Sequence, residues 1–364
     1  MAEQGKERRQ AAGNDREKVI TSTMVARAAG VSQSTVSLVL SGKSSGRVSQ
    51  ATQQMVEETA RQLGYRPNLS AQTLRTGIVK TLAFAIPDLQ QPFFGQVLYA
   101  AKLAASQRDY NLILLDTISD PCWAERLLQM YHSQVIAGCI VYAGDKAAEQ
   151  QLAPMQQHVL YIEADDEALS GIDLDSAQVV RQAVHHLTGL GHQRIGYLSA
   201  NYPRALFKRR FAAFRQTLEA LNLPFLTDWH LATGFAVEEA TLCARQLLST
   251  DITAVICDDD LLAGAVYRAA RQMGKIIPDS LSVIGFNDVE IARMLSPELT
   301  TIAIPADEIG RRSVELLLSD YSGSTPAGVN KTPLLLNLTL QVRQSTGPVS
   351  EASGLSSSPH HHRL

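Results

Sequence analysis

Residues 21–64 contain three short helix-forming segments in close succession, and this arrangement restricts the fold more than any other feature of the chain. Thr21, Ser32 and Ser49 each precede one segment, at the position where a side-chain hydroxyl caps a helix N-terminus. Gly30 lies between the first two segments, where a helix-turn-helix unit needs a tight exit from its first helix. The segments therefore predict a small three-helix head with a short turn between its first two helices.

The apolar residues of these segments are spaced for one shared core. The expected core positions are Met24, Val25, Ala28, Val36, Val39, Leu40, Val56, Ala60 and Leu63. In the second segment Gln33, Ser34, Ser37 and Leu38 are left on other faces, and the first-turn side chains of such a helix enter the major groove of DNA. On these residues alone, an ordinary three-helix appendage is the alternative.

The stretches MVARAAGVSQSTVSLVLSG and RPNLSAQTL resemble the head and hinge of the LacI/GalR family of bacterial transcription regulators. The resemblance implies a recognition helix beginning at Gln33 and a hinge helix at about 68–75 that folds in the minor groove. It also implies that Leu74 is a wedge between base steps, although Pro67 and Gly77 would suit a flexible linker equally well. The DNA-contacting positions implied are Thr21, Ser32, Gln33, Ser34, Thr35, Ser37, Leu38, Lys43, Arg47, Asn68, Ala71 and Leu74.

Composition indicates a two-part globular protein. The 364 residues are 45% hydrophobic and 19% charged, which suffices for a small head and a larger sensor of two lobes. The net charge of -3 is unevenly spread: residues 1–80 hold 12 lysines and arginines against 6 acidic residues, and the remainder holds 21 against 30. The basic end is therefore the part expected to meet phosphate.

Several classes of protein are disfavoured. The N-terminus has no apolar stretch typical of a secretory signal, and no apolar run approaches the roughly 18 residues of a membrane span, so a cytoplasmic protein is expected. The four widely spaced cysteines predict neither a zinc site nor a disulfide framework, and no cofactor is expected. The predicted parts are a disordered arm (1–18), the head (19–66), the hinge (67–79), the core (80–346) and a flexible tail (347–364).

From Lys80 onward, short apolar runs alternate with amphipathic stretches, as in parallel βαβ units. The pattern begins at TLAFAIP and restarts with SAQVVRQAVHHLTGLG. Two similar halves predict an α/β core of two doubly wound parallel sheets, with ligand bound at the carboxyl ends of the strands. GHQRIGYL, SPELTTIAIP and LQVRQST extend the family resemblance to residue 346, which implies a periplasmic-binding-protein-like core. Periplasmic sugar-binding proteins share that fold, but they need a signal peptide and lack the head.

Side chains at the strand ends are candidates for a small-molecule site. Asp88 ends the first strand of the core, and Phe93 and Phe94 open the next helix, where an aromatic ring can stack on a sugar or a base or can pack into the core. Another strand ends in three consecutive aspartates, which suit either sugar hydroxyls or a cation. Because successive side chains on a strand point apart, we favour Asp258 and Asp260 as acceptors for sugar hydroxyls over a metal site.

The family resemblance implies four further effector residues. Arg210 matches an effector-binding arginine, whose fork of donors suits hydroxyls or a carboxylate. Arg204 lies at a position that some members use, and Phe235 aligns with an aromatic residue of the cleft. Asn287 stands where the family usually has aspartate. Its amide both donates and accepts hydrogen bonds, which leaves a different class of ligand open.

The chain contains no G-x-S-x-G, P-loop or H-E-x-x-H motif, so no enzymatic activity is expected. The resemblance implies a homodimer on a pseudo-palindromic DNA operator, acting as a repressor that a small sugar or related metabolite controls. The alternatives are a corepressor-type regulator that its effector activates, an activator, and a sugar-binding protein without a regulatory role.

Overall fold

The computed structural model of the protein describes residues 20–42, 44–65, 78–142, 145–166, 169–202, 204–321 and 332–349. Contacts within the chain divide it into two compact units, Met1–Ile78 and Val79–Leu364. Within the described ranges, no helix combines the length and the apolar character that crossing a membrane requires.

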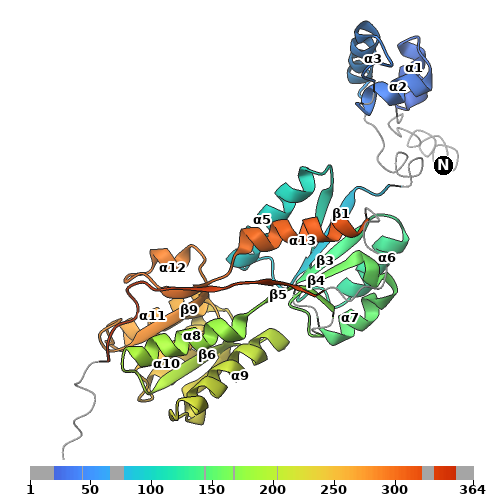
Figure 1. Ribbon diagram of the computed structural model, residues 1–364. Coiled ribbons are helices and arrows are strands. Elements are labelled where there is room, and N and C mark those ends of the chain that lie inside the picture. Colours follow the sequence, from blue (N-terminus) through green and yellow to red (C-terminus); the bar gives the residue numbers. More distant parts are fainter. Residues whose placement is uncertain are drawn as a thin grey trace, which may run out of the picture. The chain divides into compact units, whose positions relative to one another are not determined.

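Three helices make up the described part of the first unit (Figure 1): α1 (Ser22–Ala28), α2 (Gln33–Leu40) and α3 (Gln50–Gln62). The predicted caps are present, because the hydroxyls of Thr21, Ser32 and Ser49 accept hydrogen bonds from backbone N–H groups three residues later, at 3.4, 3.1 and 3.3 Å. Gly30 adopts a φ of +65°, which an L-residue rarely accepts, and this turns the chain from α1 into α2. The predicted helix-turn-helix is confirmed.

The packing face of α1 differs from the predicted one. Val25, Ala26 and Ala29 are buried, whereas Met24 is 40% exposed and Ala28 is also exposed. Both sets fit a helical period, so spacing alone could not decide between them. The face is fixed by packing against α2 and α3, where Val36, Val39, Val56 and Ala60 complete the core of the head.

The second unit has two lobes, each built on a six-stranded sheet. In lobe 1 the strand order is β11-β5-β4-β3-β1-β2, and all of these strands run parallel. Its strands are β1 (Thr81–Ile86), β2 (Asn111–Asp116), β3 (Gly138–Tyr142), β4 (Val159–Ile162), β5 (Ser170–Leu174) and β11 (Leu334–Leu336). Its helices are α5 (Pro92–Ser106), α6 (Trp123–His132), α7 (Lys146–Leu152), the 3-10 helix η2 (Ala153–His158) and α13 (Ala306–Tyr321).

Lobe 2 has the strand order β12-β10-β9-β8-β6-β7, in which β12 runs antiparallel to β10 and the other pairs are parallel. Its strands are β6 (Ile195–Ala200), β7 (His230–Thr233), β8 (Ala254–Cys257), β9 (Ser282–Asn287), β10 (Thr300–Ala303) and β12 (Thr339–Gln341). Its helices are α8 (Ser176–Gly189), α9 (Ala205–Ala220), the 3-10 helix η4 (Thr227–Trp229), α10 (Val237–Leu248), α11 (Asp260–Gln272) and α12 (Ile291–Met294).

Buried strands explain the apolar runs of the sequence. Every residue of β3, β6 and β8 is buried, as expected for parallel strands covered by helices on both faces. The predicted pair of parallel-sheet lobes is confirmed. The chain passes between the lobes three times: after β5, after β10 and between β11 and β12.

Helix α13 follows lobe 2 in sequence but packs along α5 of lobe 1 (Figure 1). The approach is closest at Gly310, where an added Cβ would collide with the carbonyl oxygen of Val97 and the backbone nitrogen of Ala101. Backbone atoms of a packed helix cannot move aside as a flexible side chain can. The contact therefore requires glycine at residue 310.

We predict that Gly310→Ala lowers the free energy of unfolding by about 1–3 kcal/mol, the usual cost of overpacking a core. Gly95 lies in α5 with no atom within 4 Å of an added Cβ, so Gly95→Ala is the control and should stabilise the protein by about 0.5–1 kcal/mol. Urea unfolding followed by circular dichroism measures both. Equal effects of the two substitutions would contradict the described packing.

Candidate functional site

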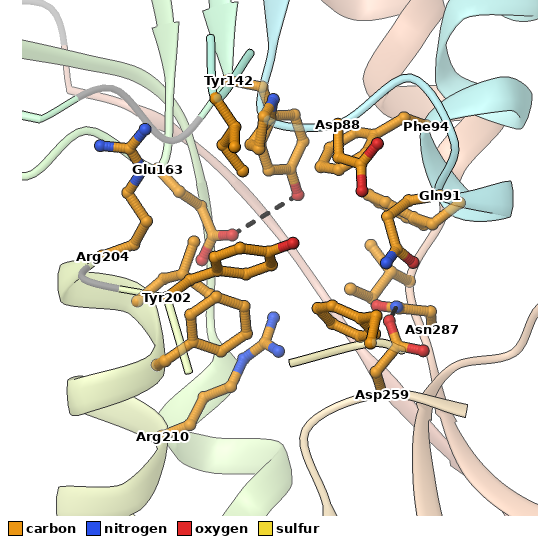
Figure 2. A pocket seen from close by; sticks show the side chains of 17 residues that line it. Asp88, Gln91, Phe94, Tyr142, Glu163, Tyr202, Arg204, Arg210, Asp259 and Asn287 are labelled. Carbon is orange, nitrogen blue, oxygen red and sulfur yellow. Dashed lines mark hydrogen bonds between the residues drawn. The ribbon is translucent and has the colours of Figure 1, made fainter. Parts of the chain in front are cut away.

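A cavity lies between the two lobes, at the carboxyl ends of their strands (Figure 2), with about 630 Å³ of atom-free space that includes its opening to solvent. Seven polar or aromatic side chains of its wall lie at the end of a strand or within two residues of it. These are Asp88 after β1, Tyr142 at the end of β3, Glu163 after β4, Tyr202 after β6, Phe235 after β7, Asp259 after β8 and Asn287 at the end of β9. The position matches the ligand site expected for such sheets.

Aromatic rings form much of the wall. In lobe 1, Phe94 and Tyr142 meet edge to face, with ring centroids 5.2 Å apart and an interplanar angle of 80°. In lobe 2, Tyr202 and Phe235 stack at 5.4 Å and 30°. Rings held in this way present fixed apolar surfaces, on which a sugar ring or a base can pack.

Arg210 brings a buried positive charge to the cavity from α9. Its side chain is 3% exposed, and its guanidinium lies over the ring of Phe286, with Cζ 3.6 Å from the ring centroid. One long hydrogen bond joins Nη1 to the backbone oxygen of Asp258 at 3.4 Å, and Nε has no partner. A buried donor without a partner is costly, so a hydrogen bond from Nε to any acceptor that reached it would remove that cost.

Glu163 brings a buried carboxyl group to the cavity from lobe 1. It is 2% exposed, and its φ of +52° is unusual for a residue other than glycine. Oε2 accepts a long hydrogen bond of 3.5 Å from the hydroxyl of Tyr142, and Oε1 has no partner. Burial raises the pKa of Glu163, and the charge of Arg210 opposes that rise.

The three consecutive aspartates have different partners. Asp258 accepts hydrogen bonds from the Tyr197 hydroxyl (2.6 Å) and the Ala200 N–H (3.0 Å). Asp260 accepts them from the Thr301 hydroxyl (2.5 Å) and the Val289 N–H (2.8 Å). Both carboxylates thus brace lobe 2, and neither residue lines the cavity.

Asp259 is the member of the run that lines the cavity. Its Oδ1 caps α11 by accepting a bond from the Leu261 N–H (2.7 Å), and its Oδ2 accepts one from Nδ2 of Asn287 (2.7 Å). Our prediction for Asp258 and Asp260 assumed strand alternation, but β8 ends at Cys257 and the chain then turns into a helix cap. Alternation therefore does not apply to these residues.

Arg204 lines the cavity but is tied to the opposite lobe. Its Nη1 lies 2.7 Å from Oδ2 of Asp145, the cap of α7 in lobe 1. Next to it, the backbone N–H of Ala205 donates to Oδ1 of Asp165, also in lobe 1, at 3.0 Å. These two contacts join the lobes along one rim of the cavity.

The structure brings most of the predicted effector residues together. Those that line the cavity are Asp88, Phe93, Phe94, Arg204, Arg210, Phe235 and Asn287. Sequence reasoning missed polar and aromatic side chains at Gln91, Tyr142, Glu163, Tyr202, Phe207 and Asp259. Tyr142 and Glu163 end their strands as Asp88 does, so the same rule applied to every predicted strand would have found them.

The head exposes the side chains predicted to read DNA. Gln33 and Ser34 are exposed in the first turn of α2, and Ser37 and Leu38 are half-buried further along. Nε2 of Gln33 donates to the Ser22 hydroxyl at 2.9 Å, which orients the amide across the start of α1. Thr21, Ser32 and Arg47 are exposed and Thr35 is half-buried. Lys43, Asn68, Ala71 and Leu74 lie outside the described residues.

A helix-turn-helix head followed by a two-lobed core with one cavity at opposed strand ends defines a class of DNA-binding regulator with a small-molecule sensor. Two family models match the chain: "Bacterial regulatory proteins, lacI family" over residues 24–68, and "Periplasmic binding protein-like domain" over residues 184–346. The protein belongs to the lacI family of bacterial regulatory proteins, and it is a transcription regulator rather than an enzyme.

Relatives and solved structures agree with this assignment. The chain is 30% identical over 335 residues to the HTH-type transcriptional regulator DegA of Bacillus subtilis, covering 90% of this chain and 98% of that protein. It is 30% identical over 331 residues to the ribose operon repressor of Haemophilus influenzae, covering 88% and 97%. Among solved structures it resembles the lac repressor dimer bound to operator and the anti-inducer ONPF, with 25% identity, a TM-score of 0.81 and coverage of 91% and 100%.

The burial of Asp259 in the cavity wall predicts how the stability of the protein depends on pH. Burial raises the pKa of Asp259 to about 7, whereas an aspartate in an unfolded chain titrates near about 3.9. Between these values the unfolded chain has released the proton that the folded chain still holds, so this group makes the protein less stable as the pH rises from about 4 to about 7. Asp259→Asn removes that loss. The melting temperature of the variant minus that of the wild type should therefore be higher at about pH 7.5 than at about pH 5.

Asp116→Asn is the matched control. Although partial burial alone would raise the pKa of Asp116, backbone N–H groups of Ser119, Ile118 and Leu89 hold it below its usual value. Its stabilising effect is lost only as the pH falls below about 4, so the melting difference for this variant should be the same at about pH 5 and about pH 7.5. A flat or falling difference for Asp259→Asn would refute the assignment of its raised pKa.

Proposed function

We propose that the protein is a homodimeric transcriptional repressor whose affinity for operator DNA is controlled by a small sugar or related metabolite bound in the cavity between the lobes. One observation carries the proposal: a single chain combines a helix-turn-helix head with a cavity that holds unpartnered buried polar atoms. The names of similar proteins support it, since one is a ribose operon repressor and another binds operator and an anti-inducer.

In the proposed division of labour, residues 19–66 read DNA, residues 67–79 form a hinge, residues 80–346 bind effector and dimerise, and the arm (1–18) and tail (347–364) are accessory. Gln33 and Ser34 reach base edges in the major groove, while Arg47 and Lys43 contact phosphate. Leu74 enters the minor groove with Asn68 and Ala71 beside it. We place the protein in the cytoplasm, where its operator is.

Effector control needs two states of the core with different affinities for the ligand. Each lobe supplies part of the wall, so a ligand that contacts both changes how firmly they close. Three chain crossings join the lobes, and β1 of lobe 1 is the first strand after the proposed hinge, so we propose that a change in closure reaches the head through lobe 1. The expected coupling between ligand and operator is about 1–3 kcal/mol. Weaker operator binding with ligand indicates an inducer, and tighter binding indicates a corepressor.

A titration with operator-sized duplexes tests DNA binding. Duplexes selected from genomic fragments should bind the full-length protein. The logarithm of the association constant should fall linearly with the logarithm of salt concentration, because phosphate contacts release counterions. No association of either selected or random duplexes in dilute salt would end the proposal. It would leave a small-molecule-binding protein without a regulatory role.

The same assay tests Gln33. Gln33→Ala should cost about 1–3 kcal/mol against the preferred operator and should change the ranking of operator variants, because a bidentate base contact is lost. Gln62→Ala, an exposed glutamine in the last turn of α3, is the control and should leave the ranking unchanged. If Gln33→Ala kept the original ranking, Gln33 would not read bases.

A further inference from the structure

The cavity contains two buried groups of opposite charge that face it without pairing. Arg210 is 3% exposed and has an unpartnered Nε, and Glu163 is 2% exposed and has an unpartnered Oε1. Figure 2 shows both side chains directed toward the same central space, Glu163 from lobe 1 and Arg210 from lobe 2. Among the described residues, the ion pairs with a nitrogen–oxygen distance of up to 4 Å do not include one between Arg210 and Glu163.

Two such groups would gain from contact with each other if nothing else satisfied them. Each is instead held in place by its own neighbours: the Arg210 guanidinium by the ring of Phe286 and the Asp258 carbonyl, and the Glu163 backbone N–H by the Ile172 carbonyl oxygen at 3.0 Å. The left-handed φ of Glu163 also fixes where its side chain starts. The contacts within each lobe thus hold the Arg210 guanidinium and the Glu163 carboxyl group apart.

A ligand that fills this gap must donate a hydrogen bond toward Glu163 and accept one from Arg210. A hydroxyl group does both, and neighbouring hydroxyls on one ring can serve the two residues together. A bound cation would face Arg210 as a like charge. The aromatic rings around the gap, including Phe94 and Phe235, suit the flat or C–H face of a ring.

Negative charge in the ligand is disfavoured by the remaining wall. Asp259 and Asp88 line the cavity with Glu163, whereas the charge of Arg204 is already engaged by Asp145. Burial raises the pKa of Glu163 and brings that of Asp259 to about 7, so the wall already resists carrying negative charge. A carboxylate or phosphate on the ligand would add to that charge.

Building on the proposed function, we infer that the effector is an uncharged hydroxylated ring, a free sugar or a nucleoside, which bridges Glu163 and Arg210. Sugar acids and sugar phosphates are excluded by Glu163. This residue is therefore a determinant of ligand charge, and its role is distinct from the packing of the aromatic wall.

The test uses full-length protein and pairs of probes that differ in charge. The pairs are D-ribose with ribose 5-phosphate, D-glucose with glucose 6-phosphate, D-galactose with D-galacturonate, cytidine with its 5′-monophosphate, and adenosine with its 5′-monophosphate. Thermal shift identifies binders, because a ligand that binds only the folded state raises the melting temperature. Calorimetry then gives Kd for the pair. At least one neutral probe should bind, and its anionic counterpart should bind at least tenfold more weakly.

Variants assign this selectivity to Glu163. Glu163→Gln keeps the shape and removes the charge, so the ratio of the two Kd values should fall at least tenfold. Glu163→Asp keeps the charge and should retain discrimination against the anion, which guards against a trivial loss of folding in the first variant. Glu149→Gln is the control: Glu149 is a buried glutamate of lobe 1 that accepts backbone N–H bonds from Asp165 and Asp166 and does not line the cavity. It should leave the ratio unchanged.

Three results would overturn the inference: equal or tighter binding of the anionic member, an unchanged ratio in Glu163→Gln, or no binding by any neutral probe. None of them affects the duplex titration, which measures the head. Failure of DNA binding with intact neutral-ligand selectivity would instead reject the regulatory proposal and leave the ligand class standing.

Discussion

Two parallel sheets that direct the carboxyl ends of their strands toward a shared space impose the constraint on which the rest of this molecule depends. Beyond the strand ends the backbone groups are no longer paired in the sheet ladder, and helices begin there, so polar side chains and helix caps lie at the same edge. Asp259 illustrates both effects, because one of its oxygens caps α11 and the other holds Asn287 at the cavity wall. Binding chemistry and fold therefore use the same residues.

Much of the fold could be predicted from local patterns. The hydroxyl caps at Thr21, Ser32 and Ser49 and the left-handed Gly30 are local features, and all four have the predicted roles. The alternation of apolar runs with amphipathic helices gave both parallel sheets. Long-range contacts could not be predicted from local patterns. Helix α13 packs on α5 although 199 residues lie between Ser106, the end of α5, and Ala306, the start of α13, and the structure shows that glycine at residue 310 permits their close approach. The face of α1 was likewise set by tertiary packing rather than by period.

The residues of the cavity wall could likewise be predicted only in part. Strand-end reasoning and family resemblance placed seven of nine predicted residues on its wall. Asp258 and Asp260 do not line the cavity, because the alternation of side chains ends with β8 at Cys257. Beyond that residue the chain turns, and the two carboxylates accept hydrogen bonds from backbone N–H groups and hydroxyls of lobe 2. Glu163 directly follows β4, so the strand-end rule reaches its position, but its unpartnered oxygen and its left-handed backbone are features that no spacing of residues records.

The ion pair between Arg204 and Asp145 ties lobe 2 to lobe 1 along one rim of the cavity. Any movement that separates the lobes along this rim must therefore break the pair. The Asp145 side chain is 38% exposed, so water can replace the lost hydrogen bond, and the free-energy cost of that separation is small compared with that of a fully buried pair.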